Sequence, residues 1–123
     1  MRYMLLTHYS ETDGRDADEE AIAAGKVAFA SYAAALHSAG VLITAEVLRP
    51  SDITTTVSSA SGELRIQDGP FADTKEQLAG VFLIDVPDLD AALSWAAQAP
   101  PVRWGAVEIR PVATHTVAGV WTE

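Results

Sequence analysis

Three residues of this 123-residue chain have side chains and positions suited to acid–base chemistry. His8 closes an apolar run, Glu46 lies between Ala45 and Val47, and Asp68 opens a polar loop. An imidazole at a strand end can donate or accept a proton near neutral pH, and a carboxylate facing a cavity can do the same. We therefore predict His8, Glu46 and Asp68 as catalytic candidates if at least two of them meet at one cavity.

Each candidate also has a purely structural interpretation. His8 then is a partly exposed residue at a strand end, and Glu46 occupies an edge position facing solvent or pairs with an arginine. His37, one turn before Gly40, fits the negative end of a helix dipole. His115 lies in the tail and is expected at the surface.

The segment Asp68–Gln77 is a dense polar loop and a candidate ligand-binding site. Asp68 can bond backbone amides two residues on, while Gly69 supplies unusual dihedrals before Pro70. Phe71 is expected to anchor the loop in the core, and Asp73 with Glu76 to cap a short helical turn. If the loop borders a pocket, we expect Asp68, Phe71 and Lys75 to bind the ligand.

Common cofactor and metal motifs do not occur in the sequence. It contains no glycine-rich dinucleotide fingerprint, P-loop, nucleophile elbow or zinc-protease motif. It contains no cysteine, which excludes disulfides and thiolate sites, and its three histidines have no metal-like spacing. We therefore expect neither a cofactor nor a bound metal.

The charge balance is acidic, with 17 Asp and Glu against 8 Lys and Arg and a net charge of −9. Direct binding to nucleic acid or to an anionic membrane is disfavoured, because both require a basic surface. Six of the acids lie within Glu11–Glu20, which is expected to be a solvated loop entering a helix, with a cation site as the alternative. The N-terminus lacks a signal-peptide pattern and no apolar run is long enough to span a membrane, so we expect a cytoplasmic protein.

Hydrophobic periodicity predicts six strands and two helices. A first helix, capped by Asp16 or Asp18, ends at Gly40, with a stripe of Ile22, Phe29, Tyr32, Ala33 and Leu36. A second opens at Pro87 and ends before Pro100, with a stripe of Leu89, Ala92, Leu93 and Ala96. The predicted strands are Met1–His8, Val41–Leu48, Ile53–Ala60, Glu63–Gln67, Leu78–Val86 and Arg103–Val112.

This order predicts an α+β, ferredoxin-like domain over Met1–Val112, followed by a tail at 113–123. The right-handed crossover preference places both helices on one face of a mostly antiparallel sheet. The first and fifth strands nevertheless carry apolar residues on both faces. A bare apolar face must be covered, so we expect a homodimer that packs sheet on sheet, with the tail packing on the partner as an open possibility.

The loop carries a family resemblance. Asp68-Gly69-Pro70-Phe71, followed by Thr74-Lys75-Glu76-Gln77, resembles the signature of the DGPF branch of the YCII-related proteins. The segments 1–6, 39–42, 82–92 and 107–112 are similar as well, so the resemblance covers about Met1–Val112. It implies a ferredoxin-like domain that dimerises through its sheet, in the manner of dimeric α/β-barrel proteins.

The resemblance implies two alternative functions. The YCII-related group was suspected of enzymatic activity because of a histidine and an aspartate, whose nearest positions here are Phe29 and Ala99. Neither side chain transfers a proton, which argues against that dyad in this chain. DGPF domains also accompany extracytoplasmic-function sigma factors. We therefore expect a module that binds a small molecule or a protein, with a sigma factor as a candidate partner, and keep a cofactor-free isomerase or lyase as the alternative.

Overall fold

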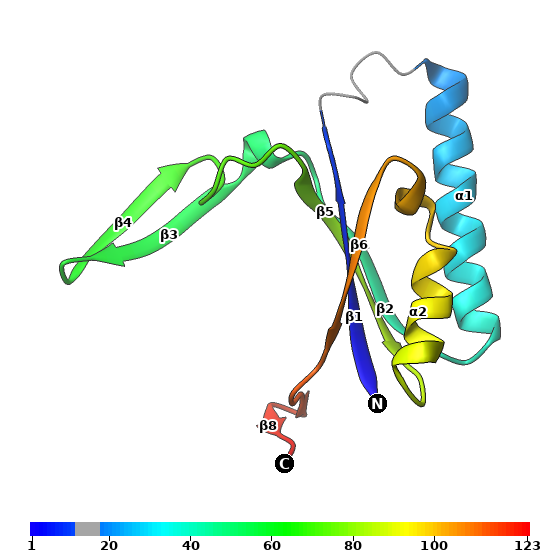
Figure 1. Cartoon of the computed structure of the whole chain (residues 1–123). Coiled ribbons are helices and arrows are strands. Elements are labelled where there is room, and N and C mark those ends of the chain that lie inside the picture. Colours follow the sequence, from blue (N-terminus) through cyan, green and yellow to red (C-terminus); the bar gives the residue numbers. More distant parts are fainter. Residues whose placement is uncertain (12–17) are drawn as a thin grey trace.

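A four-stranded antiparallel sheet forms the centre of the computed structural model, which describes residues 1–11 and 18–123. Its strand order is β2-β5-β1-β6, so each helix connects two strands that have a third strand between them (Figure 1). This confirms the predicted α+β, ferredoxin-like arrangement. The elements of this central layer are β1 (Arg2–Tyr9), α1 (Glu19–Ser38), β2 (Leu42–Val47), β5 (Gln77–Asp85), α2 (Leu89–Ala97) and β6 (Gly105–Pro111).

Both helices begin at an aspartate cap. Asp18 accepts a hydrogen bond from the Ala21 amide at 2.8 Å, and Asp88 accepts one from the Ala91 amide at 2.9 Å. Such caps satisfy amides that have no partner inside the helix. The alternative cap Asp16 lies outside the described residues. Helix α1 is followed by Gly40 with φ of 74°, a left-handed conformation that favours glycine and ends the helix.

The hydrophobic core lies between the helices and one face of the sheet. The Phe82 ring packs edge-on against Tyr32, with ring centroids 5.1 Å apart, and stacks with Phe29 at 6.4 Å. Leu5 and Leu36 are fully buried beside them. The predicted stripe of the first helix is correct at Tyr32 and Leu36 and wrong at Ile22, which is 49 % exposed.

The stripe predicted for the second helix is half wrong. Ala92 and Ala96 are buried, but Leu89 and Leu93 are more than half exposed. The small side chains of Ala92 and Ala96 let α2 approach the sheet closely, and Trp95 of the same helix is partly buried against the core. The larger apolar residues were therefore misleading here, because close packing selected the smaller ones.

The second face of the sheet is not covered by any described element, and we call it the open face (Figure 1). Its centre is an apolar block of four partly buried side chains, which lie on neighbouring strands at two successive levels. Polar and charged residues flank this block on the outer strands. The block consists of Met4, Leu6, Val81 and Leu83, and its flanks are Thr44 and Glu46 on β2 and Glu108 and Arg110 on β6.

Two hairpins project from the sheet and pair with no strand of it. The first, which we call the arm, is formed by β3 (Thr55–Ala60) and β4 (Glu63–Asp68) after a single 3₁₀ turn, η1 (Ser51–Ile53). The second, the C-terminal hairpin, consists of β7 (Thr116–Val117) and β8 (Val120–Trp121). Another 3₁₀ turn, η2 (Pro100–Arg103), links α2 to β6. No helix in the described part of the chain has the length and hydropathy of a membrane span.

Candidate functional site

A β-bulge at the start of β5 shapes the sheet end that carries His8. Thr7 pairs with Gly80 and His8 with Leu78, so Ala79 is an extra residue with no partner on β1. A Cβ on Gly80 would lie 2.6 Å from the Glu46 carbonyl oxygen, so only glycine fits there. The bulge turns Leu78 toward the same side of the sheet as His8.

The segment between the arm and β5 closes over this sheet end. Gly69, with φ of 103°, donates its amide to the Thr54 carbonyl at 2.7 Å, and its own carbonyl accepts the Thr56 hydroxyl at 2.8 Å. The predicted capping turn is wrong, because residues 71–76 contain no helix and Thr74 instead donates its hydroxyl to the Glu76 carbonyl. Gly69 therefore anchors the loop to the base of the arm.

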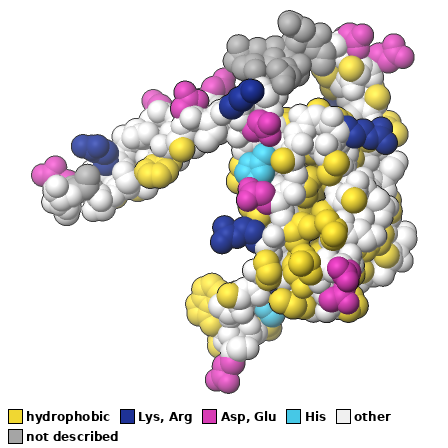
Figure 2. Space-filling model, in the orientation of Figure 1, with side chains coloured by type: hydrophobic (Ala, Val, Ile, Leu, Met, Phe, Trp, Pro, Cys, Tyr) yellow, Lys and Arg dark blue, Asp and Glu magenta, His cyan; other side chains and the backbone are white. Residues whose placement is uncertain are grey.

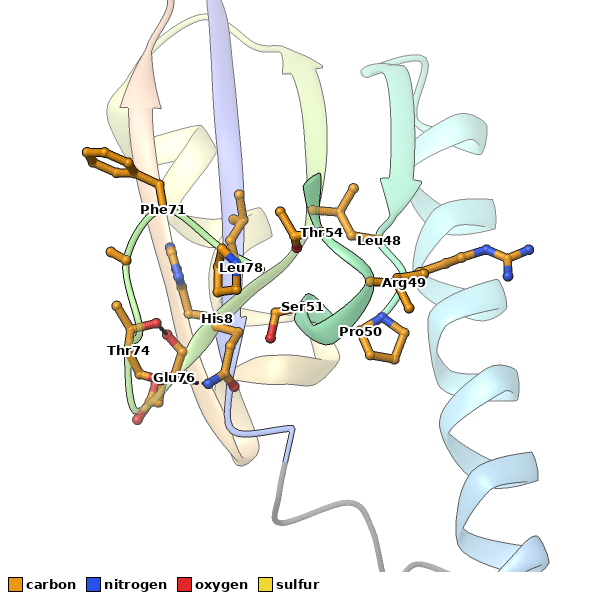
Figure 3. A pocket seen from close by; sticks show the side chains of 14 residues that line it. His8, Leu48, Arg49, Pro50, Ser51, Thr54, Phe71, Thr74, Glu76 and Leu78 are labelled. Atoms are coloured by element: carbon orange, nitrogen blue, oxygen red, sulfur yellow. Dashed lines mark hydrogen bonds between the residues drawn. The ribbon is translucent and has the colours of Figure 1, made fainter. Parts of the chain in front are cut away.

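A cavity of about 660 Å³ lies between the loop, the η1 turn and the end of β1 (Figure 3). Its walls are mainly apolar, with a few hydroxyl, amide and charged groups. The size and the character of these walls are typical of small-molecule sites. The lining residues are His8, Leu48, Arg49, Pro50, Ser51, Ile53, Thr54, Pro70, Phe71, Ala72, Thr74, Glu76, Gln77 and Leu78.

A chain of hydrogen bonds holds the two sides of the cavity together. The Glu11 carboxylate accepts the Ser51 amide at 2.8 Å and the Ser51 hydroxyl at 2.7 Å. The Glu11 amide donates to the Gln77 side-chain oxygen at 3.0 Å, and the Gln77 amide group donates to the Thr74 carbonyl at 2.6 Å. This clasp fixes η1 and the loop relative to β1.

His8 brings a titratable ring to the cavity wall. Its Nε2 atom is buried and lies 2.5 Å from the Glu108 carboxylate on β6, although the two groups are not aligned as a hydrogen bond. A carboxylate beside an imidazole orients the ring. His8 and Glu108 thus place an imidazole and a carboxylate together beside a cavity with apolar walls.

The structure does not bring the three catalytic candidates together. Of these three, only His8 lines the cavity. Glu46 is exposed on the edge strand β2, in the solvent-facing position of its structural interpretation. Asp68 is exposed at the end of β4, where it pairs with Thr55.

Only one of the three predicted ligand-binding residues lines the cavity. Phe71 lines the cavity, but it is 85 % exposed, so the prediction that it anchors the loop in the core is wrong. The loop is held by the backbone of Gly69 and by Gln77, and it therefore needs no aromatic anchor. Lys75 is exposed and lies outside the lining, as does Asp68.

A second cavity, of about 560 Å³, lies on the other side of the β1 end, between α1 and η2. Tyr9 and Trp104 meet there edge-on, with ring centroids 6.4 Å apart. Burial, followed by the nearby charge of Glu11, raises the pKa of the Tyr9 hydroxyl, so this group stays neutral at physiological pH. None of the described residues that line this second cavity is a histidine.

Comparison with known proteins identifies the family. The family description of the YCII-related domain matches residues 1–116. An uncharacterised protein of Rhizobium meliloti (strain 1021) is 44 % identical over 71 residues, which are 55 % of this chain and 56 % of that protein. The chain thus spans little more than half the length of this relative. With the family description matching nearly the whole chain, the protein belongs to the YCII-related family.

Proposed function

We propose that this protein is a homodimeric module that binds a small molecule in the cavity beside His8. The observation that carries this proposal is the cavity itself, in which apolar walls surround a buried imidazole nitrogen next to Glu108. A few polar groups in an otherwise apolar pocket provide orientation and specificity, while the walls provide most of the binding energy.

The dimer part of the proposal rests on the open face. Its apolar block is flanked by charged residues on both sides, an arrangement typical of interface cores and rims. Figure 2 shows a histidine and charged side chains along the side of the sheet that faces away from the helices. A second copy is the partner that this face fits best, because the face then covers itself about a two-fold axis.

The cavity favours a ligand with an apolar body and one polar group. Leu48, Ile53 and Leu78 are 41–60 % exposed, and each lines the cavity, so a bound apolar body removes their surface from water. A hydroxyl or carbonyl of the ligand can bond the His8 ring or the hydroxyl of Thr54. Acidic Glu76 lines the loop side, and Arg49 lines the η1 side.

Binding of 2-naphthol, an apolar ring system with a hydroxyl, tests the site. In two-dimensional amide NMR we expect the largest shifts at Thr54, Phe71 and Leu78, and about tenfold weaker binding after His8→Ala. His37→Ala is the matched control, because His37 is exposed in the last turn of α1 and lies outside the lining. Shifts centred on Tyr9 and Trp104, or no saturable binding, would overturn the assignment of this cavity.

A cofactor-free acid–base enzyme is the second candidate, favoured by the His8–Glu108 pair alone. In this version His8 transfers a proton and Glu108 orients the imidazole, and neither Glu46 nor Asp68 takes part. Cyclohexanone in D₂O is a suitable probe, because a general base exchanges the protons next to its carbonyl group. We expect the wild type to accelerate this exchange and His8→Gln to abolish the acceleration. Equal exchange rates for the two proteins would rule out this enzymatic function.

The finer parts of the function rest on the resemblance and on composition. Membership of the DGPF branch, a sigma factor as the protein partner and a cytoplasmic location stay predictions at this point. A pull-down at low salt with a neighbouring sigma factor tests the partner, because an acidic protein and a basic DNA-binding protein attract each other most strongly under that condition. Recovery of no sigma factor would exclude this role.

A further inference from the structure

The arm carries an apolar face that no element in the described part of the chain covers. Val57 pairs directly with Ile66, and Leu64 lies two residues from Ile66, so the three side chains share one face. Their exposed fractions are 62 %, 66 % and 72 %. Glu63, Arg65 and Gln67 alternate with them and form the opposite, polar face. A lone two-stranded hairpin is marginally stable in water, so this apolar face requires a partner.

The C-terminal hairpin also carries exposed apolar side chains, at the other end of the sheet. Val117 pairs directly with Val120, so these two side chains share one face, and they are 62 % and 69 % exposed. Trp121, which is 68 % exposed, lies on the opposite face of this hairpin. The arm leaves the end of the sheet that carries His8, whereas β6 leads to the C-terminal hairpin at the end that carries Arg2. Figure 1 shows both hairpins on the side of the sheet that faces away from the helices. In Figure 2 the hydrophobic side chains of the arm lie on its lower side, toward the C-terminal hairpin.

Charges on the open face select the orientation of a second copy. Glu46, Val81, Leu6 and Glu108 form one row across the four strands, and Arg110 lies one row closer to the Arg2 end. A two-fold axis along the strands would set Glu46 against Glu108, which are like charges. An axis across the strands, between the rows of Leu6 and Met4, instead sets Glu108 of each copy against Arg110 of the other. The second orientation is therefore favoured.

This orientation brings the two kinds of hairpin together. The His8 end of each sheet then lies over the Arg2 end of the other sheet, so each arm meets the partner's C-terminal hairpin. Each arm strand has six residues, and at about 3.3 Å per residue it spans about 20 Å. Two packed sheets lie about 10 Å apart, so the arm is long enough to reach past the interface.

We propose that in the dimer each β3–β4 arm packs its apolar face on the C-terminal hairpin of a second copy of this chain. This inference rests on the proposed homodimer and adds a second, reciprocal contact to it. The two arm–hairpin contacts bury five exposed apolar side chains of each subunit, which are Val57, Leu64 and Ile66 on the arm and Val117 and Val120 on the C-terminal hairpin. They also hold the base of the arm, and with it the Gly69 anchor of the cavity loop.

A double-mutant cycle on the dimer dissociation constant tests the contact between the arm and the partner's C-terminal hairpin. By sedimentation, we expect Ile66→Ser and Val120→Ser each to raise Kd about tenfold, and the double variant to raise it no further than either change alone. Such non-additivity is typical of residues that contact each other. Arg65→Ser, on the polar face of the arm, is the matched control and should leave Kd within about twofold.

The outcomes separate the arm–hairpin contact from the sheet dimer. If the wild type is dimeric while Ile66→Ser and Val120→Ser leave Kd unchanged, or if their effects simply multiply, the arm–hairpin contact is wrong and the sheet dimer stands. If the wild type sediments as a single subunit at micromolar concentration, both proposals fail. Cross-linking gives a second readout, because the chain has no natural cysteine. The Leu64→Cys/Val120→Cys variant should oxidise to a covalent dimer faster than Arg65→Cys/Val120→Cys, and equal rates would contradict the arm–hairpin contact.

Discussion

The two faces of strand β1 show how one sequence pattern serves two purposes. Tyr3, Leu5 and Thr7 point toward the helices and are at most 3 % exposed. Met4 and Leu6 alternate with them on the open face and are only partly buried. The residue types are similar, but the helices cover the first face, whereas no described element covers the second. The difference shows that alternation alone does not say which face a chain buries by its own folding.

Replacing Leu5 by alanine should have the largest effect, because this side chain is fully buried beneath the helices. We expect a loss of about 2–5 kcal/mol in the free energy of unfolding, from lost burial and from the cavity left behind. Urea denaturation at several protein concentrations measures it, and the loss should not depend on concentration. A loss below about 1 kcal/mol would mean that the helix-covered face is not the main core.

Gly105→Ala tests how tightly the covered side of the sheet is packed near His8. A Cβ at this position would overlap the His8 carbonyl oxygen, so β1 and β6 must separate. We expect a loss of about 1–3 kcal/mol, the usual effect of overpacking, measured by thermal or urea denaturation. Gly25→Ala is the control, because its Cβ meets nothing within 4 Å and helix interiors favour alanine. Equal stability of the two variants would contradict the packing at Gly105.

Leu6→Ala applies the same chemical change to the open face. In the isolated subunit the side chain is partly exposed, so we expect little change in folding at low concentration. The dimer Kd should rise at least tenfold, which corresponds to about 1.4 kcal/mol, because Leu6 belongs to the apolar block. Sedimentation at several concentrations measures this. Thr44→Ala, on the flank of the block, should have a much smaller effect; if Leu6→Ala leaves Kd unchanged, the open face is not the interface.

The sequence predicted the order of the elements because its signals are local. Asp18, Gly40 and Asp88 bound the helices through backbone hydrogen bonds or dihedrals that follow from the residue type. The exposure of Leu89 and Leu93 was not predictable in this way. Periodicity reports which residues share a helix face, but the close approach of α2 to the sheet depends on the volume of residues elsewhere in the chain.

The candidate site was predicted only in part. His8 was identified correctly as a cavity residue, since strand ends are where clefts open. Its partner Glu108 and the Glu11–Ser51 clasp were missed, because each joins residues that are at least 40 positions apart in the chain. Glu11 stood within an acidic segment that favoured a solvated interpretation. The pairing of β1 with β6 brings His8 to Glu108, and the η1 turn brings Ser51 to Glu11, so both contacts depend on the tertiary structure.

Tyr32→Phe should have the smallest effect on the free energy of unfolding. The pH dependence of this effect tests whether the Tyr32 hydroxyl is buried on the helix-covered side of the sheet. The Tyr32 hydroxyl donates to the Trp95 carbonyl at 2.8 Å and so joins the two helices, a bond whose loss costs about 1 kcal/mol. Burial raises the pKa of Tyr32 from 10.0 to about 12. Between these values the unfolded chain ionises while the folded chain does not, so the stabilising contribution of Tyr32 decreases as pH rises. The difference in urea midpoint between wild type and Tyr32→Phe should therefore be constant below pH 10, shrink above it and change sign before pH 12; a constant difference throughout would place this hydroxyl in water.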